Sequence, residues 1–64
     1  MFPNLIGQAK VRNMSNESMG KLLGVARTTY EAKLKNGTFT CNEIKLLLKY
    51  FGKEFEYLFY TEEE

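Results

Sequence analysis

The segment of residues 15–37 limits the possible folds of this chain more than any other, because it contains two short helical patterns separated by a glycine. Ser15 is suited to begin the first helix, since its hydroxyl can accept a hydrogen bond from a free amide of the first turn. Three apolar residues follow on one helical face, namely Met19, Leu22 and Leu23. Gly24 is suited to end the helix, because glycine adopts positive φ without a steric clash. The pattern predicts two helices joined by a tight turn.

The second helix is predicted over residues 26–35, with Tyr30 and Leu34 one turn apart on its inner side. Its outer side has a stripe about 140° wide by helical geometry, formed by Arg27, Thr28, Glu31, Ala32 and Lys35. Two helices joined in this way are typical of a helix-turn-helix motif, which places its second helix in the major groove of double-stranded DNA. The outer stripe is therefore the surface that DNA would meet.

The rest of the sequence predicts three further helices and no strands. The first covers residues 4–12, and another ends at Gly52 after starting at Thr40, which forms a capping box with Glu43. A last helix over residues 54–60 offers three side chains as the final wall of the core, namely Phe55, Leu58 and Phe59. The expected fold is a compact all-α domain of five helices over residues 1–61, followed by an acidic tail at 62–64.

The motif resembles the lambda-repressor-type helix-turn-helix of the XRE family of bacterial and phage regulators. The matching segments of the motif are Ser15-Asn16-Glu17, Leu23-Gly24-Val25, Arg27-Thr28-Thr29 and Lys33-Leu34-Lys35-Asn36-Gly37. The similarity continues in Phe2-Pro3-Asn4-Leu5, in Phe39-Thr40 and in Glu56-Tyr57-Leu58-Phe59. The resemblance implies a lambda-repressor-like domain of a small phage-like or mobile-element member, acting as a sequence-specific transcriptional regulator, most simply a repressor.

The resemblance also implies which residues contact DNA bases. They are Arg27, Thr28, Glu31 and Ala32. Arg27 can bridge guanine O6 and N7 or can hold a phosphate. Glu31 either accepts from cytosine N4 as a specificity residue or indicates weakened DNA binding. Ala32 can touch a thymine methyl group or can serve only as a helix former.

A second set of residues is expected to contact DNA phosphates. It comprises Asn16, Thr29, Lys33, Lys35, Asn36, Thr38 and Thr40. Family members often have a phosphate-contacting amide at the position of Asn16, where the free amides of the helix N-terminus also favour an anion. The link around Asn36 and Thr38 resembles the second phosphate clamp of the family. Asn36-Gly37 is also turn chemistry, and both roles are compatible.

Charge is concentrated in the motif half of the chain. The net charge is only +1, yet residues 10–35 contain six basic residues against two glutamates, which gives +4. Tyr57 and Tyr60 lie off the inward face of the last predicted helix and are candidates for a dimer contact, or are isolated surface tyrosines. A homodimer would bind a near-palindromic operator and would either exclude RNA polymerase from a promoter or contact it as an activator.

Enzymatic chemistry has little support in the sequence. The chain has no histidine, no aspartate and a single cysteine, so a Ser-His-Asp triad and the common zinc sites are excluded. We expect no enzymatic activity, no cofactor and no metal. Cys41 is expected to be a small apolar filler. The chain lacks an apolar run of membrane-spanning length and a secretory pattern at MFPNLIGQAK, so we expect a cytoplasmic protein with no membrane contact.

Two residues depart from the family's pattern. Gly20 replaces the usual small alanine, which lowers helix propensity by about 1 kcal/mol. Ala26 replaces the usual serine cap, at a further cost of roughly 1 kcal/mol. The alternative function is a helix-turn-helix module for protein binding, such as an antirepressor, favoured by Glu31, the modest net charge and the apolar C-terminal helix.

Overall fold

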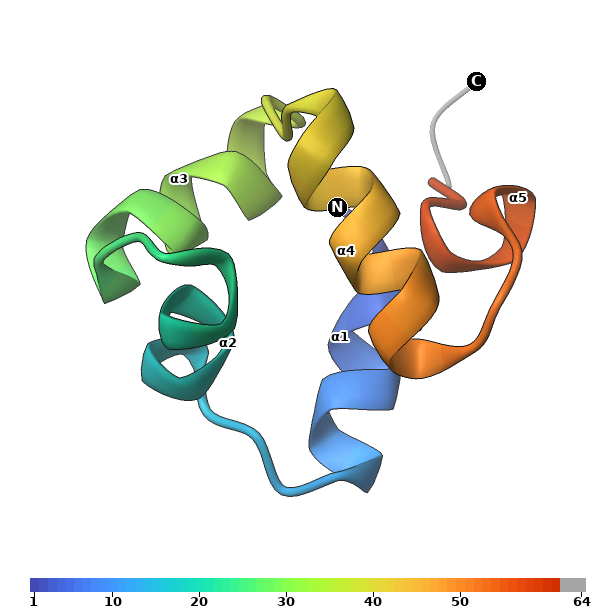
Figure 1. Cartoon of the computed structure of the whole chain (residues 1–64), viewed down its shortest axis with the longest axis horizontal. Helices are drawn as coiled ribbons and strands as arrows, with labels where there is room; N and C mark the ends of the chain where they lie inside the picture. The colour runs from blue at the N-terminus through green and yellow to red at the C-terminus, as the bar shows by residue number, and fades with distance from the viewer. Residues whose placement is uncertain (62–64) are drawn as a thin grey trace.

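The chain forms five α-helices, as a computed structural model describes for residues 1–61 (Figure 1). They are α1 (Pro3–Val11), α2 (Asn16–Leu23), α3 (Arg27–Asn36), α4 (Cys41–Phe51) and α5 (Phe55–Leu58). The described residues contain no strand, so the all-α prediction is confirmed. None of these helices is long and apolar enough to cross a membrane. The predicted acidic tail at 62–64 lies outside the described residues.

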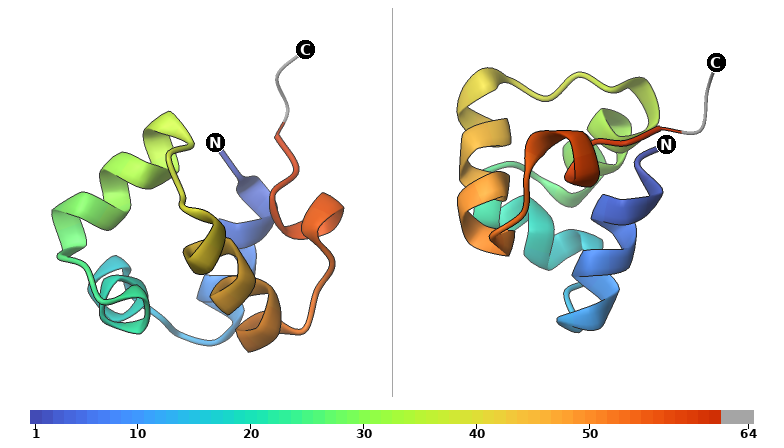
Figure 2. Two further views of the ribbon diagram at one scale, coloured as in Figure 1. Left: turned by 45° about the horizontal axis from the view of Figure 1, so that its top comes forward. Right: turned by 90° about the vertical axis from the view of Figure 1, so that its right-hand side faces the viewer.

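The helices fall into two groups in space. Helices α2 and α3 pack against each other on one side, while α5 contacts both α1 and α4 on the other (Figures 1 and 2). Every helix contributes one fully buried large side chain to a shared core, in the order Leu5, Met19, Tyr30, Leu47 and Leu58. The core therefore holds the two groups together.

The predicted helix ends are confirmed by their hydrogen bonds. The Ser15 hydroxyl accepts from the Ser18 amide at 3.1 Å, and Thr40 forms the complete capping box with Glu43. Gly24 adopts a left-handed conformation with φ of 77° just after α2. Ala26 precedes α3 without a side-chain cap, as its missing hydroxyl predicts. These local signals fix where α2, α3 and α4 begin and end.

The turn between α2 and α3 depends on a close backbone approach at Gly20. The Val25 amide donates to the Gly20 carbonyl at 2.8 Å, and the Gly24 amide donates to that of Lys21 at 3.2 Å. This pair of bonds is a Schellman motif. A Cβ atom added to Gly20 would lie 2.7 Å from the Val25 carbonyl oxygen, closer than side chains normally approach. Glycine therefore lets the turn fold back onto α2.

An aromatic cluster joins the start of the chain to its end. Phe2 is buried, and its ring packs edge-on against those of Phe39 and Phe59 with centroids 5.8 and 5.4 Å apart. Tyr30 meets Phe39 from α3 at 6.1 Å. Aromatic pairs in this geometry stabilise a core beyond the area that they bury. The cluster thus connects the motif to both termini of the described chain.

Three predictions for α4 and α5 are wrong. Phe55 was expected in the core but is 50% exposed, because it lies at the first position of α5 and stacks on the outer side of Phe59. Helix α5 also ends at Leu58 and not at residue 60. Cys41 is exposed at the start of α4 and fills no gap in the core.

Side chains in α1 and directly after it bind backbone carbonyls at the ends of α4 and α5. The two terminal nitrogens of Arg12 donate to the carbonyls of Tyr50 and Phe51 at 3.3 and 3.4 Å. The same guanidinium lies 4.9 Å from the centre of the Phe51 ring. Asn4 Nδ2 donates to the Tyr57 carbonyl at 2.8 Å. The Arg12 bonds thus provide partners for carbonyls at the C-terminal end of α4, while the Tyr57 carbonyl also accepts from the Tyr60 amide at 3.4 Å.

Candidate nucleic-acid interface

The outer side of α3 presents most of the predicted base-contacting residues to solvent. Thr28 and Ala32 are exposed, and the side chain of Arg27 is 57% exposed. Glu31 lies on the same face with 38% of its side chain exposed. Helix α3 runs along the outside of the molecule in Figures 1 and 2. The residues that sequence spacing assigned to one stripe therefore do share one accessible surface.

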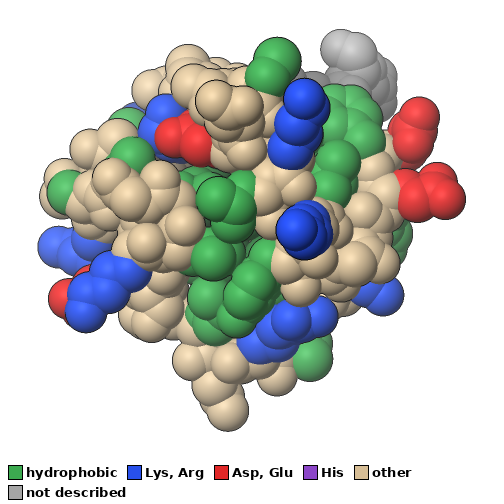
Figure 3. All heavy atoms as spheres, in the orientation of Figure 1, with side chains coloured by type: hydrophobic (Ala, Val, Ile, Leu, Met, Phe, Trp, Pro, Cys, Tyr) green, Lys and Arg blue, Asp and Glu red, His purple; other side chains and the backbone are tan. Residues whose placement is uncertain are grey.

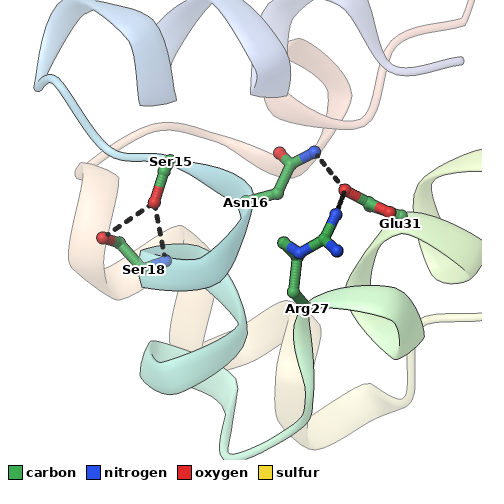
Figure 4. A network of polar contacts seen from close by, with 5 residues as sticks. All are labelled: Ser15, Asn16, Ser18, Arg27 and Glu31. Carbon is green, nitrogen blue, oxygen red and sulfur yellow. Dashed lines mark hydrogen bonds and ion pairs between the residues drawn. The ribbon is translucent and has the colours of Figure 1, made fainter.

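Glu31 joins the two helices of the motif. Its Oε2 atom accepts hydrogen bonds from Asn16 Nδ2 of α2 at 3.1 Å and from Arg27 Nη1 of α3 at 2.9 Å (Figure 4). The bond from Asn16 and the charged bond from Arg27 lower the pKa of Glu31 below its ordinary value of 4.5. Only the i,i+4 spacing of Arg27 and Glu31 was visible in the sequence. The third partner, Asn16, required the fold.

The start of α2 places Asn16 beside α3. Ser15 caps the helix with its hydroxyl, which also contacts the Ser18 hydroxyl at 3.2 Å (Figure 4). Asn16 consequently occupies the first helical position, next to amides that have no helical partner. Such amides favour an anion. Asn16, a candidate for a phosphate contact, is thus exposed and lies beside the candidate base contacts of α3.

The second group of phosphate candidates follows the other end of α3. Lys35, Asn36, Thr38 and Thr40 are exposed there, and Thr29 is exposed in the first turn of α3. A helix of ten residues is about 15 Å long. Asn16 contacts Glu31 near the middle of α3, whereas the α3–α4 link follows the C-terminal end of that helix.

Lys33 differs from the other phosphate candidates because its charge is already paired. Its Nζ lies 3.1 Å from Glu43 Oε1, and only 15% and 14% of the two side chains are exposed. The same Nζ donates to the Thr38 carbonyl at 3.4 Å. Burial raises the pKa of Glu43, but hydrogen bonds from the Thr40 amide and from Lys33 outweigh it, so the net shift is downward. Lys33 thus ties α3 to α4 and faces away from the outer stripe.

The tyrosines predicted for a dimer contact are both exposed, at 44% for Tyr57 and 52% for Tyr60. The Tyr57 hydroxyl accepts a hydrogen bond from Gln8 Nε2 at 3.4 Å. Lys53 Nζ lies 5.8 Å from the centre of the Tyr57 ring. Tyr57 is therefore held in place by the fold, although much of it stays exposed to solvent.

A hollow of about 260 Å³ lies beside Asn16. Its lining residues are Ile6, Ala9, Lys10, Met14, Ser15, Asn16 and Tyr30. Burial raises the pKa of Tyr30 to about 12, so its hydroxyl stays neutral.

Lys10 also lines this hollow and is exposed. It brings a positive charge next to the start of α2, and the sequence did not assign this residue to the interface. The only sequence signal for it was the general basic balance of this half.

The arrangement is that of an all-helical protein with an exposed polar helix and basic or amide groups beside it. Within residues 1–61, no cluster of three metal-ligating side chains is present. No protein-family model, curated protein or solved structure matches the chain.

Proposed function

We propose that this chain is a sequence-specific DNA-binding regulator with a lambda-repressor-like fold. Helix α3 enters the major groove, and two copies bind a near-palindromic operator. The observation that supports this most directly is the contact of Asn16 and Arg27 with one carboxylate of Glu31. It brings a phosphate-side donor and a base-side donor onto one exposed surface.

The two sets of contacts have separate roles in this proposal. Arg27, Thr28 and Ala32 face the bases, while Asn16 and the α3–α4 link hold the backbone on either side. Lys10 joins the phosphate contacts because it lies near Asn16. Lys33 is left out because Glu43 neutralises it. Backbone contacts fix the register of the helix, and base contacts specify the sequence.

A salt titration tests DNA binding. The affinity for a random duplex, measured by fluorescence anisotropy, should fall steeply between about 50 and 200 mM salt, because bound lysines and arginines release counterions. Absence of binding at about 50 mM salt would overturn the proposal, since phosphate contacts are strongest there.

Substitution of Arg27 tests the recognition surface. An operator is first selected from a pool of randomised duplexes with the wild-type protein. Arg27→Ala should then weaken operator binding by about 5- to 150-fold, the worth of a bidentate base contact, and weaken random DNA less. Lys49→Ala removes the same charge from the exposed surface of α4 and is the matched control. Equal losses on both DNAs would reassign Arg27 to a phosphate.

A protein-binding module remains the second candidate because hydrophobic side chains are exposed outside the outer stripe of α3. In the orientation of Figure 1 some are visible between the α2–α3 group and α4 (Figure 3), and others belong to α4 and α5. Leu46, Tyr50 and Phe55 are each at least 40% exposed. If the protein binds no DNA at low salt but forms a complex with another protein through these exposed hydrophobic side chains, the result would favour the antirepressor-like function.

A further inference from the structure

One oxygen of Glu31 receives donors from two helices. Asn16 reaches Oε2 from α2, and Arg27 reaches the same atom from α3 (Figure 4). The two bonds hold the carboxylate where α2 meets α3. Because they also lower its pKa, the carboxylate is ionised at neutral pH and stays so in mildly acidic solution. Glu31 is therefore a fixed anionic anchor for both donors.

We propose that Glu31 is a positioning residue that orients Arg27 to recognise guanine and makes no base contact itself. This inference rests on the proposed function. A guanidinium has five N–H donors in a rigid planar fork. Nη1 is bound to Glu31, whereas Nε and Nη2 form no hydrogen bond with any residue in the described part of the chain. That free edge matches the O6 and N7 acceptors of guanine.

The relative exposure of the two side chains supports this division of roles. Arg27 is 57% exposed and Glu31 only 38%, so the guanidinium has more surface open to a partner than the carboxylate. An ordered arginine also loses less conformational freedom when it binds. Asn16 keeps a second Nδ2–H for a phosphate. The Glu31 carboxylate thus fixes the positions of Arg27, the donor to the base, and Asn16, the donor to the phosphate, relative to each other.

The test compares a selected operator duplex with the same duplex in which 7-deazaguanine, which lacks N7, replaces one guanine at a time. For the guanine that Arg27 contacts, the wild-type protein should bind the modified duplex about fivefold or more weaker. Arg27→Ala should show a ratio near one. Glu31→Ala should lower the wild-type ratio by about twofold or more, towards but not below the value near one of Arg27→Ala, because the arginine then has to be ordered when it binds.

Glu17→Ala is the matched control, because Glu17 is an exposed carboxylate on the same motif. Both glutamate variants remove one negative charge and should raise the affinity for random DNA similarly, but Glu17→Ala should keep the wild-type ratio. A Glu31→Ala ratio equal to that of the wild type would overturn the proposal. A second outcome would also overturn it, namely a wild-type ratio near one at every guanine together with a large loss of operator affinity in Glu31→Ala. Glu31 would then contact a base directly.

A second measurement examines the anchor without DNA. In the free protein, the Asn16 side-chain amide should shift in NMR spectra with a pH midpoint below 4.5. The shift should vanish in Glu31→Ala and persist in Glu17→Ala. If the wild-type amide does not respond, the anchor is absent and the inference is overturned while the proposed function stands. If the wild-type protein enriches no duplex, the proposed function fails and this inference fails with it, before any variant is made.

Discussion

The α2–α3 motif and the group formed by α1, α4 and α5 are stabilised by different kinds of contact. Within the motif, polar contacts join residues that all belong to the segment 15–37, such as the Ser15 cap and the bonds of Glu31. In the other group, Phe2 packs against Phe59, and Arg12 binds carbonyls at the end of α4. The motif is thus built largely by its own segment, whereas the other group needs the whole chain.

This difference is suited to a protein that recognises a partner with one exposed helix. Helix α3 buries only Tyr30 fully, so most of its side chains stay available. The position and orientation of α3 come from the turn that packs against Gly20 and from contacts with the shared core. The group formed by α1, α4 and α5 supplies most of the buried side chains of the shared core, and the motif provides a surface of defined geometry. Substitutions in the two groups should therefore have different consequences.

The largest expected effect on stability is in the group formed by α1, α4 and α5. Leu47 is fully buried on α4, while its neighbour Leu46 is 40% exposed. Leu47→Ala should lower the free energy of unfolding by about 2–5 kcal/mol, because it leaves a cavity at the centre of the core. Leu46→Ala should change it by about 0.5 kcal/mol or less. Urea denaturation followed by circular dichroism measures both, and similar losses would contradict the assignment of α4's buried face.

The next prediction concerns two glycines, one in each group. Their replacement by alanine should change the stability of the protein less than Leu47→Ala does, and in opposite directions. A Cβ atom added to Gly7 in α1 would have nothing within 4 Å of it, whereas one added to Gly20 would meet the Val25 carbonyl. Gly7→Ala should stabilise the protein by up to about 1 kcal/mol through helix propensity. Gly20→Ala should destabilise it by about 1–3 kcal/mol, the usual cost of overpacking. Thermal unfolding of the two variants measures the difference, and equal stabilisation would show that the turn yields without cost.

The same contrast explains what sequence could predict. The caps at Ser15 and Thr40 and the left-handed Gly24 depend on residues only a few positions apart, so their chemistry was visible in the sequence. The shared exposure of Thr28 and Ala32 followed from helical periodicity. The caps of α2 and α4, the glycine that ends α2 and the exposed face of α3 could therefore be predicted without the fold.

Contacts between distant residues could not be derived in that way. Phe2 is buried because Phe39 and Phe59 surround it, and neither is near it in sequence. Phe55 has the same hydrophobic character yet lies outside, because only one face of a four-residue helix meets the core. In the candidate site, the bond from Asn16 to Glu31 spans fifteen positions and depends on the turn between the helices.

The ion pair between Lys33 and Glu43 links the two groups and should produce the smallest of these effects, through pH. The folded protein holds the pKa of Glu43 below its ordinary 4.5, because the Thr40 amide and Lys33 outweigh the effect of burial. The ionised carboxylate thus stabilises the fold above about pH 4.5, and this contribution is lost as the pH falls through the lower, folded-state pKa.

The comparison of Glu43→Gln with the wild type isolates that contribution. Above the ordinary glutamate pKa the variant should unfold at a lower urea concentration than the wild type. This gap between the two urea midpoints should close on acidification, because the protonated wild-type side chain then resembles glutamine. Glu56→Gln, at an exposed position of α5, should show little gap at any pH. A gap for Glu43→Gln that does not change with pH would mean that the capping-box shape, and not the charge facing Lys33, joins α4 to the motif.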